Sequence, residues 1–171
     1  MSVFTSFNKT VVVLAALFVL VTSCNPQTIY IVRHAEKMEA GGAMITSDVP
    51  LTPAGEQRAQ HLKDLLLNKG VKYIFSTPTM RTRSTAGPLS DLTGVPVQLY
   101  APRDTMNLFV QRVRSLRNGN VLIVGHSNTV DDLVNSFTGK ILLTDLPETE
   151  YDNLFILHRK GNIYRLERKK F

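Results

Sequence analysis

The chain has 171 residues, a formal net charge of +6 at pH 7 and a single cysteine, and this length suffices for one domain with a sizeable core. One cysteine excludes an internal disulfide and a zinc site made of cysteines. The basic charge is compatible with an anionic substrate, nucleic acid or anionic lipid, so charge alone does not choose among these partners.

The first 23 residues differ in composition from the rest of the chain. Lys9 is the only charged residue among them, and residues 11–23 form an uncharged, mostly apolar run. The run is shorter than the roughly 20 residues of a membrane span. It has the length of the hydrophobic region of a signal peptide. The alternative is a buried N-terminal helix, but the run is apolar on all sides and not amphipathic.

The segment Val-Thr-Ser-Cys that ends at Cys24 resembles the lipobox of bacterial lipoproteins. The resemblance implies cleavage before Cys24 and a diacylglyceryl thioether on its sulfur, which anchors stably because it carries two acyl chains. We therefore expect a signal peptide over residues 1–23, a lipidated tether over 24–27 and an exported protein that is anchored to a bacterial membrane and faces the periplasm. Ordinary signal cleavage, which would leave Cys24 free, is the alternative.

Residues 28–171 are expected to form one domain in which strands alternate with helices. Thr52 is a suitable N-cap before Pro53, and glycines such as Gly70 and Gly94 end predicted helices. The predicted strands are 28–32, 71–76, 97–100, 121–124, 154–157 and 163–166. The predicted helices are 53–69, 81–92, 108–116 and 131–137, and the third has Leu108, Val113 and Leu116 on its apolar side. This order predicts a three-layer α/β/α sandwich with a mainly parallel sheet.

Cationic side chains follow three of the predicted strands. Arg33 and His34 come after the first strand and His126 after the fourth, while Arg81 and Arg83 open the helix after the second. Functional sites of such sheets lie beyond the carboxyl ends of the strands, where these groups would meet. One guanidinium group can bind two phosphoryl oxygens at once, so arginines at the ends of these strands indicate a phosphate site.

Three other kinds of site fit the sequence poorly. A metal ion between His34 and His126 would be repelled by the neighbouring arginines, so no metal is expected. The segment from Gly125 to Thr129 begins like the nucleophile elbow of serine hydrolases, but Thr129 stands where that motif requires glycine. Nucleic-acid binding is not expected either, because the arginines are not interleaved with aromatic residues in a stripe. The basic C-terminal tail, residues 165–171, is interpreted as a solvated or lipid-facing end.

Four motifs, in order, resemble those of the histidine phosphatase superfamily, which includes cofactor-dependent phosphoglycerate mutase. Arg33-His34-Ala35-Glu36 resembles its Arg-His-Gly-Glu signature, and residues 51–55 resemble its Leu-Thr-x-x-Gly helix start. Residues 76–86 resemble its Ser-x-Pro-x-x-Arg-x-x-x-Thr-Ala segment, and residues 125–127 its second histidine motif. The resemblance implies a phosphoglycerate mutase-like fold.

The resemblance also implies roles for individual residues. His34 would be the nucleophile that forms a phosphohistidine, and Arg33, Arg81 and His126 would hold the phosphoryl group, without a metal or another cofactor. The expected activity is hydrolysis of a small phosphorylated molecule or of a phosphohistidine protein. A catalytically idle anion-binding module and a mutase-type phosphotransferase are the alternatives. Mutase activity is less expected, because Lys37, Met38 and Glu39 replace the residues that continue the mutase signature.

The proton donor is the least defined part of the expected site. Asp104 is the candidate, since larger relatives carry an acid between the segment of Arg81 and that of His126. Its alternative role is to cap the following helix. Glu36 and Asp48 are poorer candidates, and Glu36 is expected to orient the loop after the first strand. Arg83 and Thr85 are expected to cap and pack the helix that presents Arg81.

Overall fold

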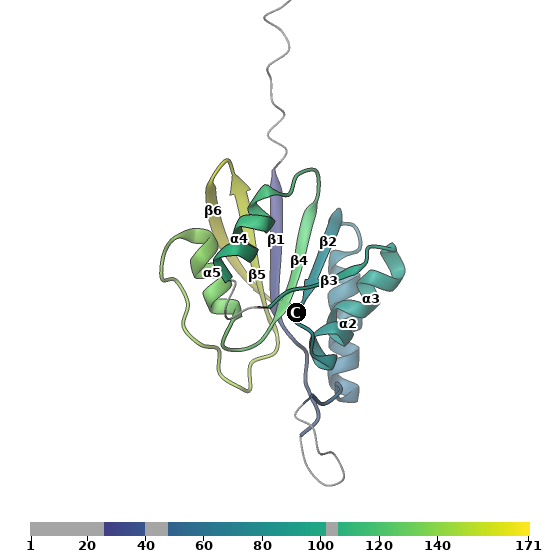
Figure 1. Cartoon of the computed structure of the whole chain (residues 1–171). Helices are drawn as coiled ribbons and strands as arrows, with labels where there is room; N and C mark the ends of the chain where they lie inside the picture. Colours follow the sequence, from purple (N-terminus) through teal and green to yellow (C-terminus); the bar gives the residue numbers. More distant parts are fainter. Residues whose placement is uncertain (1–25, 40–47, 102–105) are drawn as a thin grey trace, which may run out of the picture.

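The computed structural model describes residues 26–39, 48–101 and 106–171. The expected signal peptide, the expected lipidation site Cys24 and the candidate acid Asp104 lie outside these residues. The described part contains one six-stranded sheet with the strand order β3-β2-β4-β1-β5-β6 (Figure 1). None of its helices is long and apolar enough to cross a membrane.

The sheet is mixed, so the prediction of a mainly parallel sheet is not confirmed. Its strands are β1 Gln27–Arg33, β2 Val71–Ser76, β3 Val97–Leu99, β4 Asn120–Gly125, β5 Asn153–Lys160 and β6 Ile163–Lys170. The first four pair in parallel, whereas β5 runs antiparallel to β1, and β6 runs antiparallel to β5. Residues 139–152 contain neither helix nor strand and return the chain to the end of β1, so β5 starts there and runs the other way.

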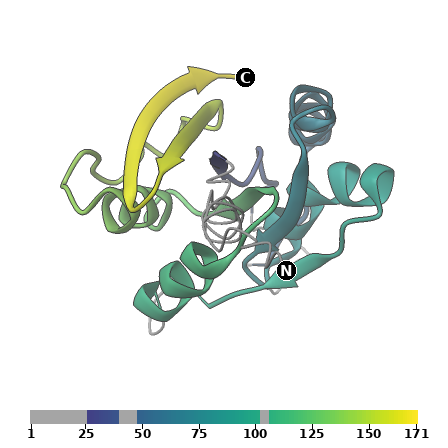
Figure 2. The ribbon, with the colours of Figure 1, turned by 90° about the horizontal axis from the view of Figure 1, so that it is seen from above.

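Two pairs of helices cover the two faces of the sheet, which gives the predicted three layers (Figure 2). The helices α2 Pro53–Leu66 and α3 Met80–Thr93 lie on one face, and α4 Met106–Ser115 and α5 Val130–Thr138 lie on the other. Successive strand residues point to opposite faces. Ile29 and Ile31 of β1 therefore pack against α4 and α5, while Tyr30 and Val32 pack against α2 and α3.

The predicted apolar side of α4 is confirmed for Val113, which is buried, and for Leu116, which packs against the core, but not for Leu108. Leu108 is 65% exposed, whereas Phe109, Val110 and Val113 are buried. The ring of Phe109 stacks on that of Tyr100 with the centroids 4.1 Å apart, and this contact helps to set how the helix lies on the sheet. The basic C-terminal tail belongs to the edge strand β6, in which Arg165, Arg168, Lys169 and Lys170 are exposed as expected for a solvated end, whereas Phe171 is buried.

The start of α2 shows why the helix-start motif contains a glycine. The Thr52 hydroxyl accepts a hydrogen bond from the Gly55 backbone N–H at 3.1 Å, which confirms Thr52 as the N-cap. The Thr52 N–H donates to the Glu36 carbonyl oxygen at 2.9 Å, so the helix start lies against the loop after β1. A Cβ atom on Gly55 would come within 2.2 Å of that same carbonyl oxygen. A larger residue at position 55 would therefore push this loop, which carries His34, away from α2.

We expect Gly55→Ala to lower the free energy of unfolding by about 2 kcal/mol, the cost of overpacking against backbone that must shift. Gly87→Ala is the matched control, because a Cβ atom there meets nothing within 4 Å and alanine favours a helix interior by about 0.5–1 kcal/mol. Chemical denaturation of both variants measures the difference. Equal stabilities of the two variants would contradict this account of Gly55.

Candidate active site

The structure brings Arg33, His34, Arg81 and His126 to one edge of the sheet. Arg33 ends β1 and His34 follows it, His126 follows β4, and Arg81 lies in the first turn of α3. The His34 N–H donates to the Gly125 carbonyl oxygen at 2.9 Å, which continues the pairing of β1 with β4. All four side chains line a pocket of about 600 Å³, here called the histidine pocket, to which Lys37, Ser127 and Glu148 also contribute.

His34 has the geometry of a neutral nucleophile. Its side chain is 3% exposed, and its Nδ1 donates to the Ala35 carbonyl oxygen at 2.8 Å, which leaves the lone pair on Nε2. Burial, against the opposing effect of the Ala35 hydrogen bond and together with the charges of Arg33, Arg81 and His126, lowers the pKa of His34 to about 3. The imidazole is therefore neutral at neutral pH, with Nε2 able to attack an electrophile.

Thr85 connects the loop of His34 to the helix of Arg81. Its hydroxyl accepts from the Ala35 N–H at 2.9 Å and donates to the Arg81 carbonyl oxygen at 2.8 Å. The side chain is 1% exposed, so this connection is shielded from water. The expected structural role of Thr85 thus corresponds to a specific pair of contacts. Arg83, two residues from Arg81 on the same helix, is exposed and does not line the pocket.

His126 lies between Thr77 and Arg81. Its Nδ1 is 3.4 Å from a terminal guanidinium nitrogen of Arg81, which can only donate, so Nε2 carries the hydrogen and donates to the Thr77 hydroxyl at 2.9 Å. The rings of His126 and His34 meet edge to face with their centroids 5.4 Å apart. A group bound between the two histidines would therefore contact a cation and both rings at once.

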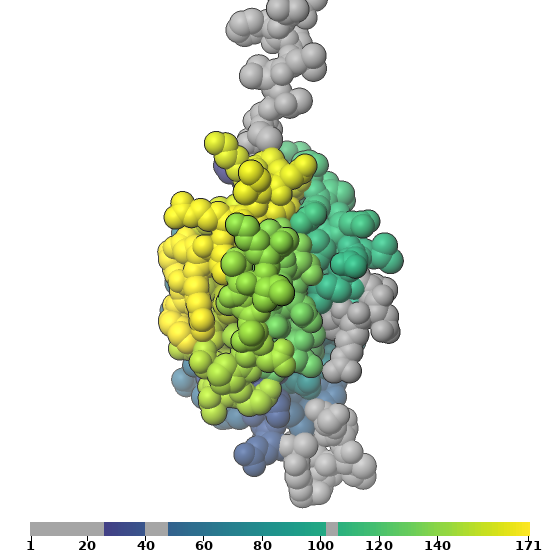
Figure 3. All heavy atoms as spheres, turned by 90° about the vertical axis from the view of Figure 1, so that its left-hand side faces the viewer, coloured from purple at the N-terminus to yellow at the C-terminus, as the bar shows by residue number. Residues whose placement is uncertain are grey.

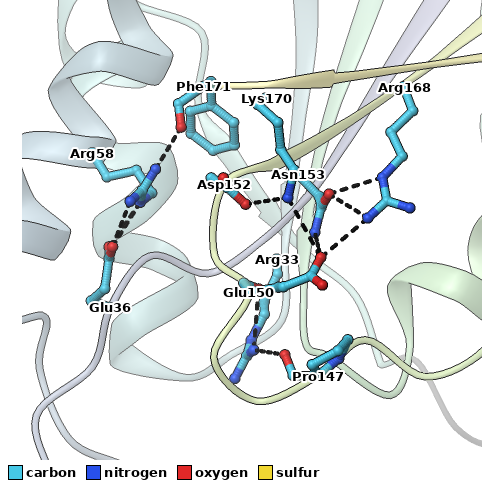
Figure 4. A network of polar contacts seen from close by, with 10 residues as sticks. All are labelled: Arg33, Glu36, Arg58, Pro147, Glu150, Asp152, Asn153, Arg168, Lys170 and Phe171. Atoms are coloured by element: carbon cyan, nitrogen blue, oxygen red, sulfur yellow. Dashed lines mark hydrogen bonds and ion pairs between the residues drawn. The ribbon is translucent and has the colours of Figure 1, made fainter.

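The loop that precedes β5 holds Arg33 through several hydrogen bonds (Figure 4). The sequence did not indicate this contact. Its Nη1 donates to the carbonyl oxygens of Pro147, Glu148 and Glu150, at 3.0, 3.0 and 3.3 Å. Its Nη2 donates to the Glu148 carboxylate at 2.6 Å, and the guanidinium carbon lies 4.1 Å from the centroid of the Tyr151 ring. The acidic composition of residues 145–152 was the available signal, but it does not say which cation these residues approach.

The carboxylates weighed as proton donors have different positions. Glu36 forms a two-pronged ion pair with Arg58, with Nε–Oε distances of 2.9 Å and a shorter contact of 2.7 Å from Nη2 (Figure 4). This pair ties the loop after β1 to α2, the role expected for Glu36. Asp48 lies 3.7 Å from the Arg81 guanidinium and accepts from the Met80 N–H.

Within the described residues, no three potential metal ligands of the His, Cys, Asp and Glu types lie close enough to hold an ion.

Residues 29–102 match the sequence model of the histidine phosphatase superfamily, branch 1. The probable phosphoglycerate mutases GpmB of Erwinia tasmaniensis and Escherichia fergusonii are each 31% identical over 90 residues, which cover 52% of this chain and 42% of theirs. The chain thus spans less than half the length of these curated relatives.

Solved structures match nearly the whole domain in fold. The protein histidine phosphatase SixA complexed with tungstate has a TM-score of 0.67 at 17% identity, over 84% of this chain and 96% of that one. A phosphoserine phosphatase from Entamoeba histolytica in complex with 3-phosphoglyceric acid has a TM-score of 0.64 at 12% identity, over 85% and 98%. At these identities the likeness concerns the fold.

Proposed function

We infer that this chain is a member of the histidine phosphatase superfamily, and from that premise we propose that it is a metal-independent phosphatase. It hydrolyses phosphomonoesters or phosphohistidine through a phosphohistidine intermediate on His34. The observation that carries the proposal is a neutral, buried imidazole with a free Nε2 that shares one pocket with two arginines and a second histidine. These are the parts that phosphoryl transfer needs when no metal takes part.

The reaction proceeds in two displacements at phosphorus. Nε2 of His34 attacks the phosphoryl group, the P–N bond forms, and the bond to the leaving oxygen or nitrogen breaks. Arg33 and Arg81 donate hydrogen bonds to the phosphoryl oxygens as their charge is redistributed, and His126 donates from Nδ1 when it is protonated. Water then attacks the phosphohistidine from the side that the leaving group vacated. Inorganic phosphate leaves, and His34 returns to its neutral form.

Hydrolysis of para-nitrophenyl phosphate in the presence of EDTA tests this proposal. Turnover that persists with the chelator supports a phosphatase that needs no divalent metal. Binding of phosphate without any turnover would instead identify an anion-binding module. Transfer between 2- and 3-phosphoglycerate faster than release of phosphate would identify a mutase, the activity after which the curated relatives are named.

The proposed proton donor is Asp104, and its contribution should depend on the leaving group. An alkoxide needs a proton to leave, whereas para-nitrophenolate does not, and general acid catalysis contributes roughly 10²- to 10⁴-fold. We expect Asp104→Asn to slow alkyl phosphates by such a factor and to spare para-nitrophenyl phosphate. The ratio of kcat/KM for the two substrates measures the effect. An equal loss on both would assign Asp104 to folding or helix capping instead.

We also propose that a lipid on Cys24 anchors the protein with its active site directed away from the membrane. Residue 26, the first one described, directly precedes β1, and His34 directly follows the last residue of this strand, Arg33. The two ends of β1 lie on opposite sides of the domain (Figure 1). A strand of this length separates its ends by roughly 20 Å. An anchor two residues before residue 26 would leave the histidine pocket open to the periplasm and to soluble substrates.

Cys24→Ser is expected to shift the protein from the membrane fraction to the soluble fraction or to block its processing, because serine cannot carry the thioether. Fractionation with detection of incorporated fatty acid measures both outcomes. Absence of fatty acid from the membrane-bound wild type would contradict the lipid anchor and favour retention by the apolar run at residues 11–23.

A further inference from the structure

Negative charge gathers beside the histidine pocket, although the chain as a whole is basic. Residues 131–152 include six carboxylates: Asp131, Asp132, Asp145, Glu148, Glu150 and Asp152. Glu150 and Asp152 pair with Arg168 and Lys170 on β6. The other four line the histidine pocket or the adjoining hollow between α5 and residues 139–145, and Asp145 lines both. This segment forms the green surface below the hairpin in Figure 3.

Glu148 makes the closest contact between this acidic segment and the candidate phosphate site. One carboxylate oxygen accepts from Arg33 Nη2 at 2.6 Å, and the other accepts from the Ser127 hydroxyl at 2.5 Å. The Ser127 hydrogen bond and the charge of Arg33 lower the pKa of Glu148, so it is ionised at neutral pH. Its side chain is 71% exposed while that of Arg33 is 1% exposed, so the carboxylate can move and the guanidinium cannot.

Arg33 does not need Glu148 to keep its orientation. Three backbone carbonyl oxygens already hold Nη1, and the Tyr151 ring covers the face of the guanidinium. Glu148 instead lies on Nη2, and the adjacent Nε has no hydrogen-bond partner among the described residues. Nε and Nη2 form one edge of the guanidinium fork, the edge that remains for a phosphoryl group. An arriving phosphoryl oxygen must therefore displace the Glu148 carboxylate.

We propose that Glu148 is a specificity-determining residue that exchanges partners when substrate binds and thereby selects phosphorylated compounds that carry a positive charge. The inference rests on the proposed function in one respect, that Arg33 binds the phosphoryl group. When substrate binds, its phosphoryl group replaces the Glu148 carboxylate as the partner of Arg33. The Glu148 carboxylate then pairs with an ammonium or guanidinium group of the same substrate. The number of ion pairs is then conserved. A substrate without a cation leaves a carboxylate beside a phosphate dianion, where like charges repel.

The surroundings of Glu148 favour the same class of substrate. Asp131, Asp132 and Asp145 form no ion pair with any described Lys, Arg or His, so they add negative potential on this side of the pocket. Lys37 is the competing cation of the protein. It lines the same pocket and acts on Glu148, but it forms no ion pair with it.

The test compares O-phosphoethanolamine with propyl phosphate, which have similar size and differ in the ammonium group. We expect the wild-type chain to show a kcat/KM about fivefold higher for O-phosphoethanolamine than for propyl phosphate. This factor corresponds to the free energy that one exposed ion pair contributes. In Glu148→Gln, the KM for propyl phosphate should fall because no carboxylate competes for Arg33, and the preference should fall to about one. Glu56→Gln is the matched control, since Glu56 is exposed on α2 and does not line the pocket; it should keep the wild-type preference.

Three results would overturn the proposal. One is equal kcat/KM values for the two compounds in the wild type, which would mean that Lys37 takes up the released carboxylate. Another is a preference that Glu148→Gln leaves unchanged. The third is a large fall in kcat on both compounds in Glu148→Gln, which would make Glu148 a proton donor.

If the chain hydrolyses no phosphate compound at all, the proposed function fails. Calorimetric binding of the two compounds to the wild type and to Glu148→Gln then decides about Glu148 alone, and equal affinities in the wild type would overturn its selective role.

Discussion

His34→Ala is expected to lower kcat by at least about 10⁴-fold on every phosphate substrate while the fold is retained. Loss of a nucleophile commonly has an effect of this order, because no alternative route lowers the barrier comparably. Hydrolysis of phosphate monoesters is among the slowest uncatalysed reactions, so little background activity would hide the loss. Among the described residues of the histidine pocket, His34 is the group with a neutral imidazole and a free Nε2. Steady-state kinetics and circular dichroism measure activity and fold.

A rapid quench with a labelled substrate extends this prediction to the intermediate. The wild type should hold acid-labile phosphate on His34, and His34→Ala should hold none. His158→Ala is the control, because His158 is half exposed on β5 and pairs with Glu167 at the surface, where such a pair contributes little to stability. Wild-type turnover in His34→Ala, or acid-stable label in the wild type, would exclude the phosphohistidine mechanism.

Arg81→Lys is expected to lower kcat/KM by roughly 10²-fold or more, the effect of removing one donor that stabilises charge in the transition state. Lysine keeps the positive charge but cannot offer the planar fork that binds two phosphoryl oxygens. The variant also loses the contact between the Arg81 guanidinium and His126 Nδ1. This contact fixes the tautomer of the His126 ring. The effect should appear mainly in kcat, because the fork acts most strongly on the charge that shifts during transfer.

Arg83→Lys provides a matched control for Arg81→Lys. The two arginines lie two residues apart on α3, but only Arg81 lines the histidine pocket, and Arg83 is exposed. The Arg83 variant should therefore retain nearly full kcat and KM. Similar losses in both variants would mean that substitutions on α3 disturb the helix as a whole, and would contradict a specific role for the guanidinium fork of Arg81.

The amino-acid sequence by itself determined the elements and the chemical character of the site. Uncharged runs rich in β-branched and other apolar residues predicted β1 and β4, because a strand buried on both faces needs apolar side chains throughout. Thr52 and Gly94 marked helix ends through local hydrogen bonding and through a backbone φ of 70° at Gly94, effects that involve only near neighbours in the chain. Arg33, His34, Arg81 and His126 were predicted to meet because strands of a parallel sheet end at one edge, and the pocket contains all four.

Only the tertiary structure decided which long-range partners these elements take. The antiparallel placement of β5 depends on the path of residues 139–152, which has no periodic pattern to interpret. Apolar spacing predicted that Val113 is buried, but the burial of Phe109 in place of Leu108 depends on the ring of Tyr100, on which Phe109 stacks. Glu148 reaches Arg33 across 115 positions of sequence. An ionic contact of this kind depends on where two loops converge in space, so the local composition of either loop cannot predict it.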